Sequence, residues 1–194
     1  MPDLSAPRRQ LAERLHADAE RGVTTFPTTA AQRRIWLLHH MAPHSSRYTM
    51  PAALRLYGEL DPSALQRALT AVVTRHEALR TTFPAVDGVP VQQVHAEARL
   101  RLEVRERNGV EPLDALRSAV AEPFDLVAGP LARAILWPTA TGEHLLLIAV
   151  HHIAADGWSL PILLSDLAAA YRAEREGRVL ALAPLRIQGG DYAV

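Results

Sequence analysis

The 194-residue sequence contains no cysteine. This absence excludes disulfide bonds, a thiolate nucleophile and any zinc site built on sulfur ligands. Long apolar runs are also lacking, because no stretch reaches the length of a membrane-spanning helix. The N-terminal residues have no apolar core of the kind that a secretion signal needs. We therefore expect a soluble, cytoplasmic protein that does not enter a membrane.

An excess of charge of either sign is missing as well. Lys and Arg together number 21, as do Asp and Glu, so the net charge is zero with histidine neutral. Without a basic stripe, nucleic acid is not expected as the main ligand. The glycine-rich phosphate loops of nucleotide-binding folds are absent, and the single Gly-Gly pair is at 189–190.

Apolar spacing and cap residues predict a chain that alternates between helices and strands. Thr29 and Gln32 form a capping-box pair, and Asp61 followed by Pro62 is a good helix start. Gly177 is a plausible helix stop, and Ser159 can cap the last helix. The expected helices cover 28–41, 61–79, 111–124 and 159–177, and the expected strands cover 52–58, 79–83, 89–95, 100–106, 131–137 and 143–150. The predicted fold class is α/β: an α+β sandwich in which helices cover a mixed sheet.

The first 23 residues differ from the rest, because they are charged and alanine-rich with a weak helical stripe. They are predicted to be a leader, a linker or a docking helix. The following residues have the size of one ordinary domain, or of one lobe of a larger one.

The stretch IAVHHIAADGWSL, residues 148–160, contains the main candidate site. Strand side chains alternate between faces, so His151 and His152 are expected to point in opposite directions. Asp156 follows after a turn that Gly157 permits. From the residues alone three interpretations stay open: a strand-end histidine with local hydrogen bonds, a general base, or a metal ligand.

Metal binding is the least favoured of the three, because adjacent strand residues rarely ligate one ion together. His39, His40 and His44 form a second histidine cluster. The first two are neighbours on an expected helix and diverge, so no metal is expected there either.

Taken together, five stretches of the sequence resemble motifs of the condensation domains of non-ribosomal peptide synthetases. HHIAADGWS resembles their HHxxxDG motif, and RHEALRTTF, residues 75–83, matches RHExLRTxF without a mismatch. The stretches TTAAQRRIWLL, PFDLVAGPLARAIL and QGGDYAV resemble three further family motifs, in family order. The resemblance covers about residues 24–194. It implies the N-terminal lobe of a condensation domain, with a fold like chloramphenicol acetyltransferase, and the sequence ends inside the last motif.

The resemblance implies acyl transfer from a carrier-bound aminoacyl or peptidyl thioester to the amine of a carrier-bound acceptor. The phosphopantetheine arm comes with the carrier protein, so no cofactor binds the domain directly. Donor and acceptor carrier domains and a C-terminal lobe are the implied partners. That second lobe completes the active-site tunnel, so this chain alone is expected to be inactive.

Carried over residue by residue, His152 faces the tunnel and acts on the acceptor amine, as general base or by positioning it. His151 packs on the other face and supports the loop. Asp156 is expected to be structural and to pair with an arginine of the second motif, with Arg80 favoured and Arg75 as the alternative.

Two neighbours of these residues are also expected to contribute. Gly157 keeps the turn open to substrate, and Trp158 lines the tunnel or packs in the core.

Departures from the family pattern are Thr28-Thr29 for the usual serine and Gly189-Gly190 for the usual Tyr-Ala. An epimerisation or ester-forming relative, and a non-catalytic domain that binds carrier or tailoring proteins, remain alternative hypotheses.

Overall fold

A four-stranded mixed sheet lies at the centre of the computed structural model, which describes residues 22–97 and 99–193. Strand β8 runs antiparallel to both of its neighbours, and β6 joins the other edge of β7 in parallel. The strand order is β2 (Thr49–Tyr57), β8 (Glu143–His151), β7 (Ala132–Ala140) and β6 (Leu102–Val104). The prediction of a mixed sheet is confirmed.

A smaller antiparallel sheet is built around one strand, β5 (Val89–His95). Its turn at Asp87-Gly88 has φ angles of 52° and 80°, which suits a tight hairpin and confirms the predicted turn. The strands paired with β5 are β1 (Val23–Pro27), β3 (Thr81–Thr82) and β4 (Ala85–Val86).

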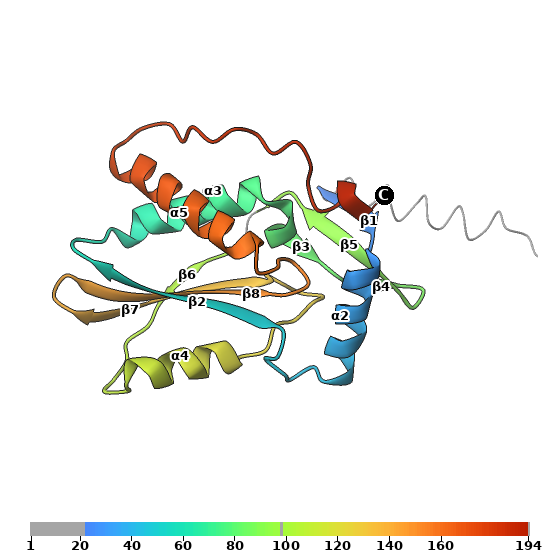
Figure 1. Ribbon diagram of the computed structural model, residues 1–194, viewed down its shortest axis with the longest axis horizontal. Helices are drawn as coiled ribbons and strands as arrows, with labels where there is room; N and C mark the ends of the chain where they lie inside the picture. Colours follow the sequence, from blue (N-terminus) through green and yellow to red (C-terminus); the bar gives the residue numbers. More distant parts are fainter. Residues whose placement is uncertain (1–21, 98, 194) are drawn as a thin grey trace, which may run out of the picture.

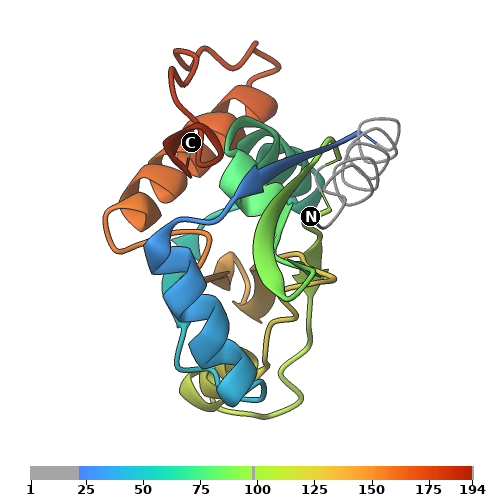
Figure 2. The same cartoon turned by 90° about the vertical axis from the view of Figure 1, so that its right-hand side faces the viewer.

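Helices cover both faces of the central sheet, as Figure 1 shows. Helices α3 (Pro62–Arg75) and α5 (Ser159–Arg175) lie together on one face, and α4 (Pro112–Ala121) covers the other. Helix α2 (Ala30–Met41) stands at the end of the sheet where β8 finishes (Figure 2). Within the described residues, no helix has the length and apolar character needed to cross a membrane.

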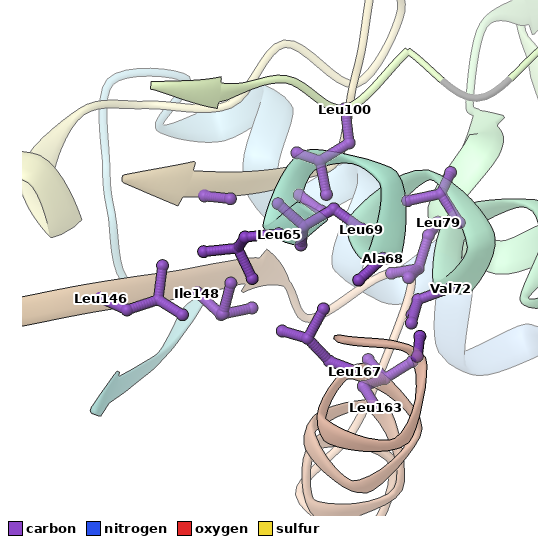
Figure 3. Close-up of a cluster of buried hydrophobic side chains, with 14 of the residues drawn as sticks. Leu65, Ala68, Leu69, Val72, Leu79, Leu100, Leu146, Ile148, Leu163 and Leu167 are labelled. Carbon is purple, nitrogen blue, oxygen red and sulfur yellow. The ribbon is translucent and has the colours of Figure 1, made fainter. Parts of the chain in front are cut away.

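The alternation of β8 divides the core into two clusters. Leu146, Ile148 and Val150 face α3 and α5, where leucines from all three elements meet (Figure 3). Leu145, Leu147 and Ala149 face the opposite way, toward α4. The continuous apolar run of β8 is explained by this coverage on both faces.

The helix starts agree largely with the predicted caps. Thr29 and Gln32 form the complete capping box, with bonds of 2.8 and 3.1 Å. The Asp61 carboxylate accepts hydrogen bonds from Ser63 N–H and Ala64 N–H at 2.8 and 3.0 Å. At the other end of α5, Gly177 adopts a φ of 61°, which confirms the predicted stop.

Several boundaries differ from the predictions. Val23 belongs to β1 and not to a leader, and the rest of the predicted leader except Gly22 lies outside the described residues. The predicted strand at 100–106 shrinks to β6, because it is an edge strand with one partner in the described chain. Helix α3 ends at Arg75, and a 3₁₀ turn, η1 (Glu77–Arg80), separates it from β3.

The segment after α5 has little regular structure apart from the short turn η2 (Asp191–Ala193). It runs back past α3 and α5 and finishes beside β1 (Figure 1). We refer to residues 178–193 as the C-terminal segment.

Candidate active site

The histidine pair lies where β8 leaves the central sheet and the chain turns toward α5. Two backbone hydrogen bonds fix the chain here. His151 N–H donates to Leu131 O at 2.9 Å, and His152 N–H donates to Tyr48 O at 2.8 Å. Ala154 N–H then donates back to His151 O at 2.9 Å, which closes the turn. Residues 152–158 form what we call the active loop.

His151 is an interior residue with only 2% of its surface exposed. Its ring is edge-on to those of His39 and Phe124, with centroids 5.2 and 5.9 Å away, and the Tyr48 ring lies at 6.2 Å. Its Nδ1 accepts the Ile153 N–H at 3.2 Å, so the neutral ring carries its proton on Nε2.

Burial is the main reason why the pKa of His151 falls to about 4, and the charges of His39 and His152 act in the same direction. His151 is therefore neutral at physiological pH. Its Nε2 is buried without a hydrogen-bond partner among the described residues. This residue supports the loop through packing and one backbone bond, and its environment disfavours a role in proton transfer.

His152 has the opposite environment, since its side chain is exposed on the outer side of the loop. This is the arrangement that strand alternation predicts. His152 is thus the histidine of the pair that a substrate can reach.

Asp156 organises the start of α5. Its Oδ1 accepts hydrogen bonds from Ser159 N–H at 2.8 Å, Ser159 Oγ–H at 2.6 Å and Trp158 N–H at 3.1 Å. These hydrogen bonds, above all that from the Ser159 hydroxyl, hold the pKa of the exposed Asp156 carboxyl below its usual value, and the nearby His152 adds to the effect. Asp156 therefore caps α5 as an anion, whereas the sequence suggested Ser159 for that task.

The predicted pairing of Asp156 with an arginine is wrong. Arg80 turns toward the small sheet, where its guanidinium donates to His95 O and, at 3.2 Å, to the Glu77 carboxylate. Arg75 lies 3.0 Å from the carboxylate of Asp166 on α5. Asp166 is about 10 Å further along the helix than the loop, at 1.5 Å per residue, so Arg75 supports the loop only through α5.

Gly157 and Trp158 are both exposed on the loop. Gly157 has no positive φ, and a Cβ added there would meet nothing within 4 Å, so the turn itself does not require glycine. The open space beside it is compatible with the predicted approach of substrate. Trp158 is 86% exposed, so among residues 22–97 and 99–193 its ring does not pack in the core.

The other tryptophans and the second histidine cluster fall outside the loop or behind it. Trp137 is buried, and the Trp36 indole donates to Phe83 O at 3.0 Å. His40 stacks on Trp36 with centroids 3.7 Å apart, while the buried His39 turns to His151. No group of three or more potential metal ligands occurs in the described part of the chain.

Sequence reasoning missed the side chains that enclose His151. Phe124 lies in the PFDL stretch, but nothing local indicates that its ring meets His151 across the fold. His39 was considered only as a metal ligand. Asp166 stands out in the sequence only as an acidic residue on the apolar face of a helix. A carboxylate buried on such a face needs a partner, but the sequence does not indicate which residue that is.

The fold is a mixed sheet covered by helices on both faces, with the histidine pair at the end of its strand β8. Comparison with known proteins then gives the family: the condensation domain profile matches residues 23–194, and the chain belongs to that family. A dimodular nonribosomal peptide synthase of Bacillus subtilis (strain 168) is 45% identical over 171 residues, covering 87% of this chain and 7% of that protein.

Solved structures agree with this assignment. The X-domain in its complex with OxyB from teicoplanin biosynthesis is 41% identical with a TM-score of 0.76, covering 87% of this chain and 37% of that chain. The first condensation domain of the calcium-dependent antibiotic synthetase, in complex with a substrate analogue, is 27% identical with a TM-score of 0.72 and coverages of 84% and 40%. The chain therefore spans about two-fifths of the solved relatives.

Proposed function

We propose that this chain is the N-terminal lobe of a condensation domain that forms an amide bond. A carrier-bound aminoacyl or peptidyl thioester is the donor, and the amine of a second carrier-bound residue is the acceptor. The observation that carries the proposal is the exposed His152 that follows a buried, neutral His151 at the end of β8, in the segment that matches the family motif.

In the proposed reaction the amine nitrogen attacks the thioester carbonyl. The C–N bond forms, the C–S bond breaks, the amine loses a proton, and the sulfur leaves as a thiolate that takes up a proton. Imidazole can accept a proton near neutral pH, so His152 acts on the acceptor amine as a general base or by positioning it. No residue of the chain needs to form an acyl-enzyme, which fits the absence of cysteine.

Asp156 supports this reaction by holding the loop. Its carboxylate accepts hydrogen bonds from Trp158 N–H and Ser159 N–H, which fixes the turn that follows His152. Two substrates tethered to carrier proteins also meet at high effective concentration, which supplies much of the rate. The phosphopantetheine arms belong to those carriers.

The test is His152→Ala in the complete synthetase, with peptide product measured by mass spectrometry. We expect product to fall by about a hundredfold or more, the range usual for loss of an acid–base group, while carrier loading is unchanged. His44→Ala is the matched control, since His44 is also an exposed loop histidine. Wild-type product formation by His152→Ala would refute the role. A D-configured residue on the upstream carrier would point to epimerisation, and an ester product to the ester-forming alternative.

A second candidate function is recruitment of a partner protein without turnover. The 41% identity to the X-domain that was solved in complex with OxyB favours it. Binding of a tailoring protein by a two-lobe protein that makes no peptide with any loaded carrier pair would support this alternative.

A further inference from the structure

The corner between α3 and η1 contacts two elements that lie far from it in the sequence, α5 and the C-terminal segment. Arg75 and His76 direct their side chains to Asp166 on α5, while the backbone on either side of His76 binds Gln188 of the C-terminal segment. We call residues 75–77 the RHE corner. Of these residues only Arg75 had an expected role, as the alternative partner of Asp156, and its partner is Asp166 instead.

Asp166 is the contact of the corner with α5. A single oxygen, Oδ2, accepts a hydrogen bond from Arg75 Nε at 3.0 Å and lies 2.7 Å from His76 Nε2. The side chains of Asp166, Arg75 and His76 are 12%, 19% and 14% exposed. A carboxylate this deep needs its partners, so the position of α5 opposite the corner is strongly specified.

The direction of this contact matters for the active loop. The leucines that pack α5 on α3 and β8 attract without a preferred direction (Figure 3). The Asp166 contact is directional and lies two turns from Ser159, where the loop enters α5. It therefore sets how far the Asp156 cap and the loop project from the sheet.

Gln188 makes the matching contact with the C-terminal segment. Its side-chain amide donates to Arg75 O at 3.0 Å and accepts from Glu77 N–H at 3.3 Å, while its own N–H donates to the Asp191 carboxylate at 3.0 Å. The segment is thus bound to the two residues that flank His76. The C-terminal segment and Asp166 therefore contact the same three-residue corner.

We propose that the RHE corner couples the C-terminal segment to the active loop, with Asp166 and Gln188 as positioning residues. The coupling is a property of the fold, and its relevance to catalysis rests on the function proposed above. In the solved relatives more than half of the chain lies outside the part matched here. Contact of such further parts with the C-terminal segment would displace the RHE corner and, through Asp166 and α5, the active loop.

Amide hydrogen exchange of the full chain tests the coupling without any turnover. Gln188→Leu is expected to speed exchange in residues 152–160 about 2- to 10-fold, the range for loss of one or two hydrogen bonds, and to leave α4 on the opposite face unchanged. Gln66→Leu is the matched control. The Gln66 side-chain amide also bonds two nearby backbone groups, since it donates to Leu100 O and accepts from Leu102 N–H, but it connects α3 to β6.

A double-mutant comparison separates coupling from general loosening. Asp166→Leu removes both contacts to the corner, so Gln188→Leu should add little exchange at the loop in that background, whereas Asp166→Asn keeps an acceptor and should retain most of the effect. If α4 exchange also rises, Gln188→Glu, which keeps the acceptor for Glu77 N–H, replaces Gln188→Leu. An unchanged loop, an equal effect of Gln66→Leu, or additive effects with Asp166→Leu would overturn the proposal.

The same variants, placed in the complete synthetase, test whether the coupling affects catalysis. Gln188→Leu should lower kcat more than it raises KM, because the carriers still bind while the loop is misplaced. Faster loop exchange with unchanged kcat would keep the coupling and reject its role in catalysis. A failure of His152→Ala to reduce product would reject the proposed function and leave the exchange result standing.

Discussion

His39 on α2 and His151 at the end of β8 face each other edge to ring, with their centroids 5.2 Å apart and both side chains buried. The pKa of each is lowered chiefly by burial. Two neutral imidazoles therefore meet edge to ring where α2 meets the sheet. The contact ties the first family-like motif, which forms α2, to the active loop that follows His151.

Replacing His39 separates packing from charge at this contact. His39→Ala should cost about 1–3 kcal/mol of unfolding free energy, because it opens a cavity beside His151. His39→Phe keeps an edge-on aromatic ring, so the expected loss is below about 1.5 kcal/mol. Urea unfolding followed by tryptophan fluorescence measures both. Equal losses for the two variants would show that the imidazole, and not the ring packing, matters.

The lowered pKa of His151 predicts loss of stability in mild acid. In the unfolded chain His151 has a pKa near its ordinary value of 6.5, and in the folded protein it has one of about 4. As pH falls from 6.5 to 4 the unfolded state takes up a proton that the folded state does not, so stability falls by up to about 1.4 kcal/mol per pH unit. His39 acts in the same direction.

His151→Asn is the control for this pH dependence. Its side-chain oxygen can accept the Ile153 N–H in place of Nδ1, and it does not titrate. The unfolding free energy of this variant should depend less steeply on pH between 6.5 and 4 than that of the wild type. Parallel pH profiles would mean that His151 is not the group responsible.

Substitutions at Asp156 distinguish a helix cap from an ion pair. Asp156→Ala removes the acceptor for two N–H groups and should destabilise the fold by about 1 kcal/mol, while Asp156→Asn should cost less. Arg80→Ala serves as the control, because an ion pair between the two would make its loss non-additive with Asp156→Ala. Additive losses in the double variant are expected. A coupling above about 0.5 kcal/mol would restore the arginine pairing.

Local chemistry allowed much of the fold to be predicted. The caps at Thr29 and Asp61 and the turn at Asp87-Gly88 depend on neighbours in sequence, and all three agree with the structure. The covered strand at 143–150 was recognisable because apolar residues on both faces leave a continuous run. Val23–Pro27 was missed because pairing with β5, nearly seventy residues away, makes it a strand.

The candidate site was predictable only in part. Alternation placed His151 and His152 on opposite sides, which requires nothing beyond the strand period. The partner of Arg75 could not be derived, because Asp156 and Asp166 both follow the histidines and helical geometry alone does not tell which of these two meets Arg75. That choice is made by the packing of α5 on α3.

The last prediction concerns Arg133, which packs on the Phe124 ring that contacts His151. Its guanidinium lies over the Phe124 ring, 4.6 Å from the centroid, and donates to Ala119 O, Glu122 O and Pro123 O at 3.0–3.2 Å. These carbonyls end α4 and begin the PFDL stretch. Since Phe124 in turn packs edge-on to His151, Arg133 fixes one wall of the pocket that keeps His151 neutral.

Arg133→Met should therefore destabilise the fold by about 1–3 kcal/mol, because the carbonyls lose their donors while the apolar stem remains. Arg133→Lys should recover little of this loss, since an ammonium cannot reproduce the planar fork of donors. Phe124 should also become less ordered, so the resonance of the His151 ring in NMR spectra is expected to shift in both variants. A lysine variant as stable as the wild type would show that charge alone, and not the fork geometry, holds this wall.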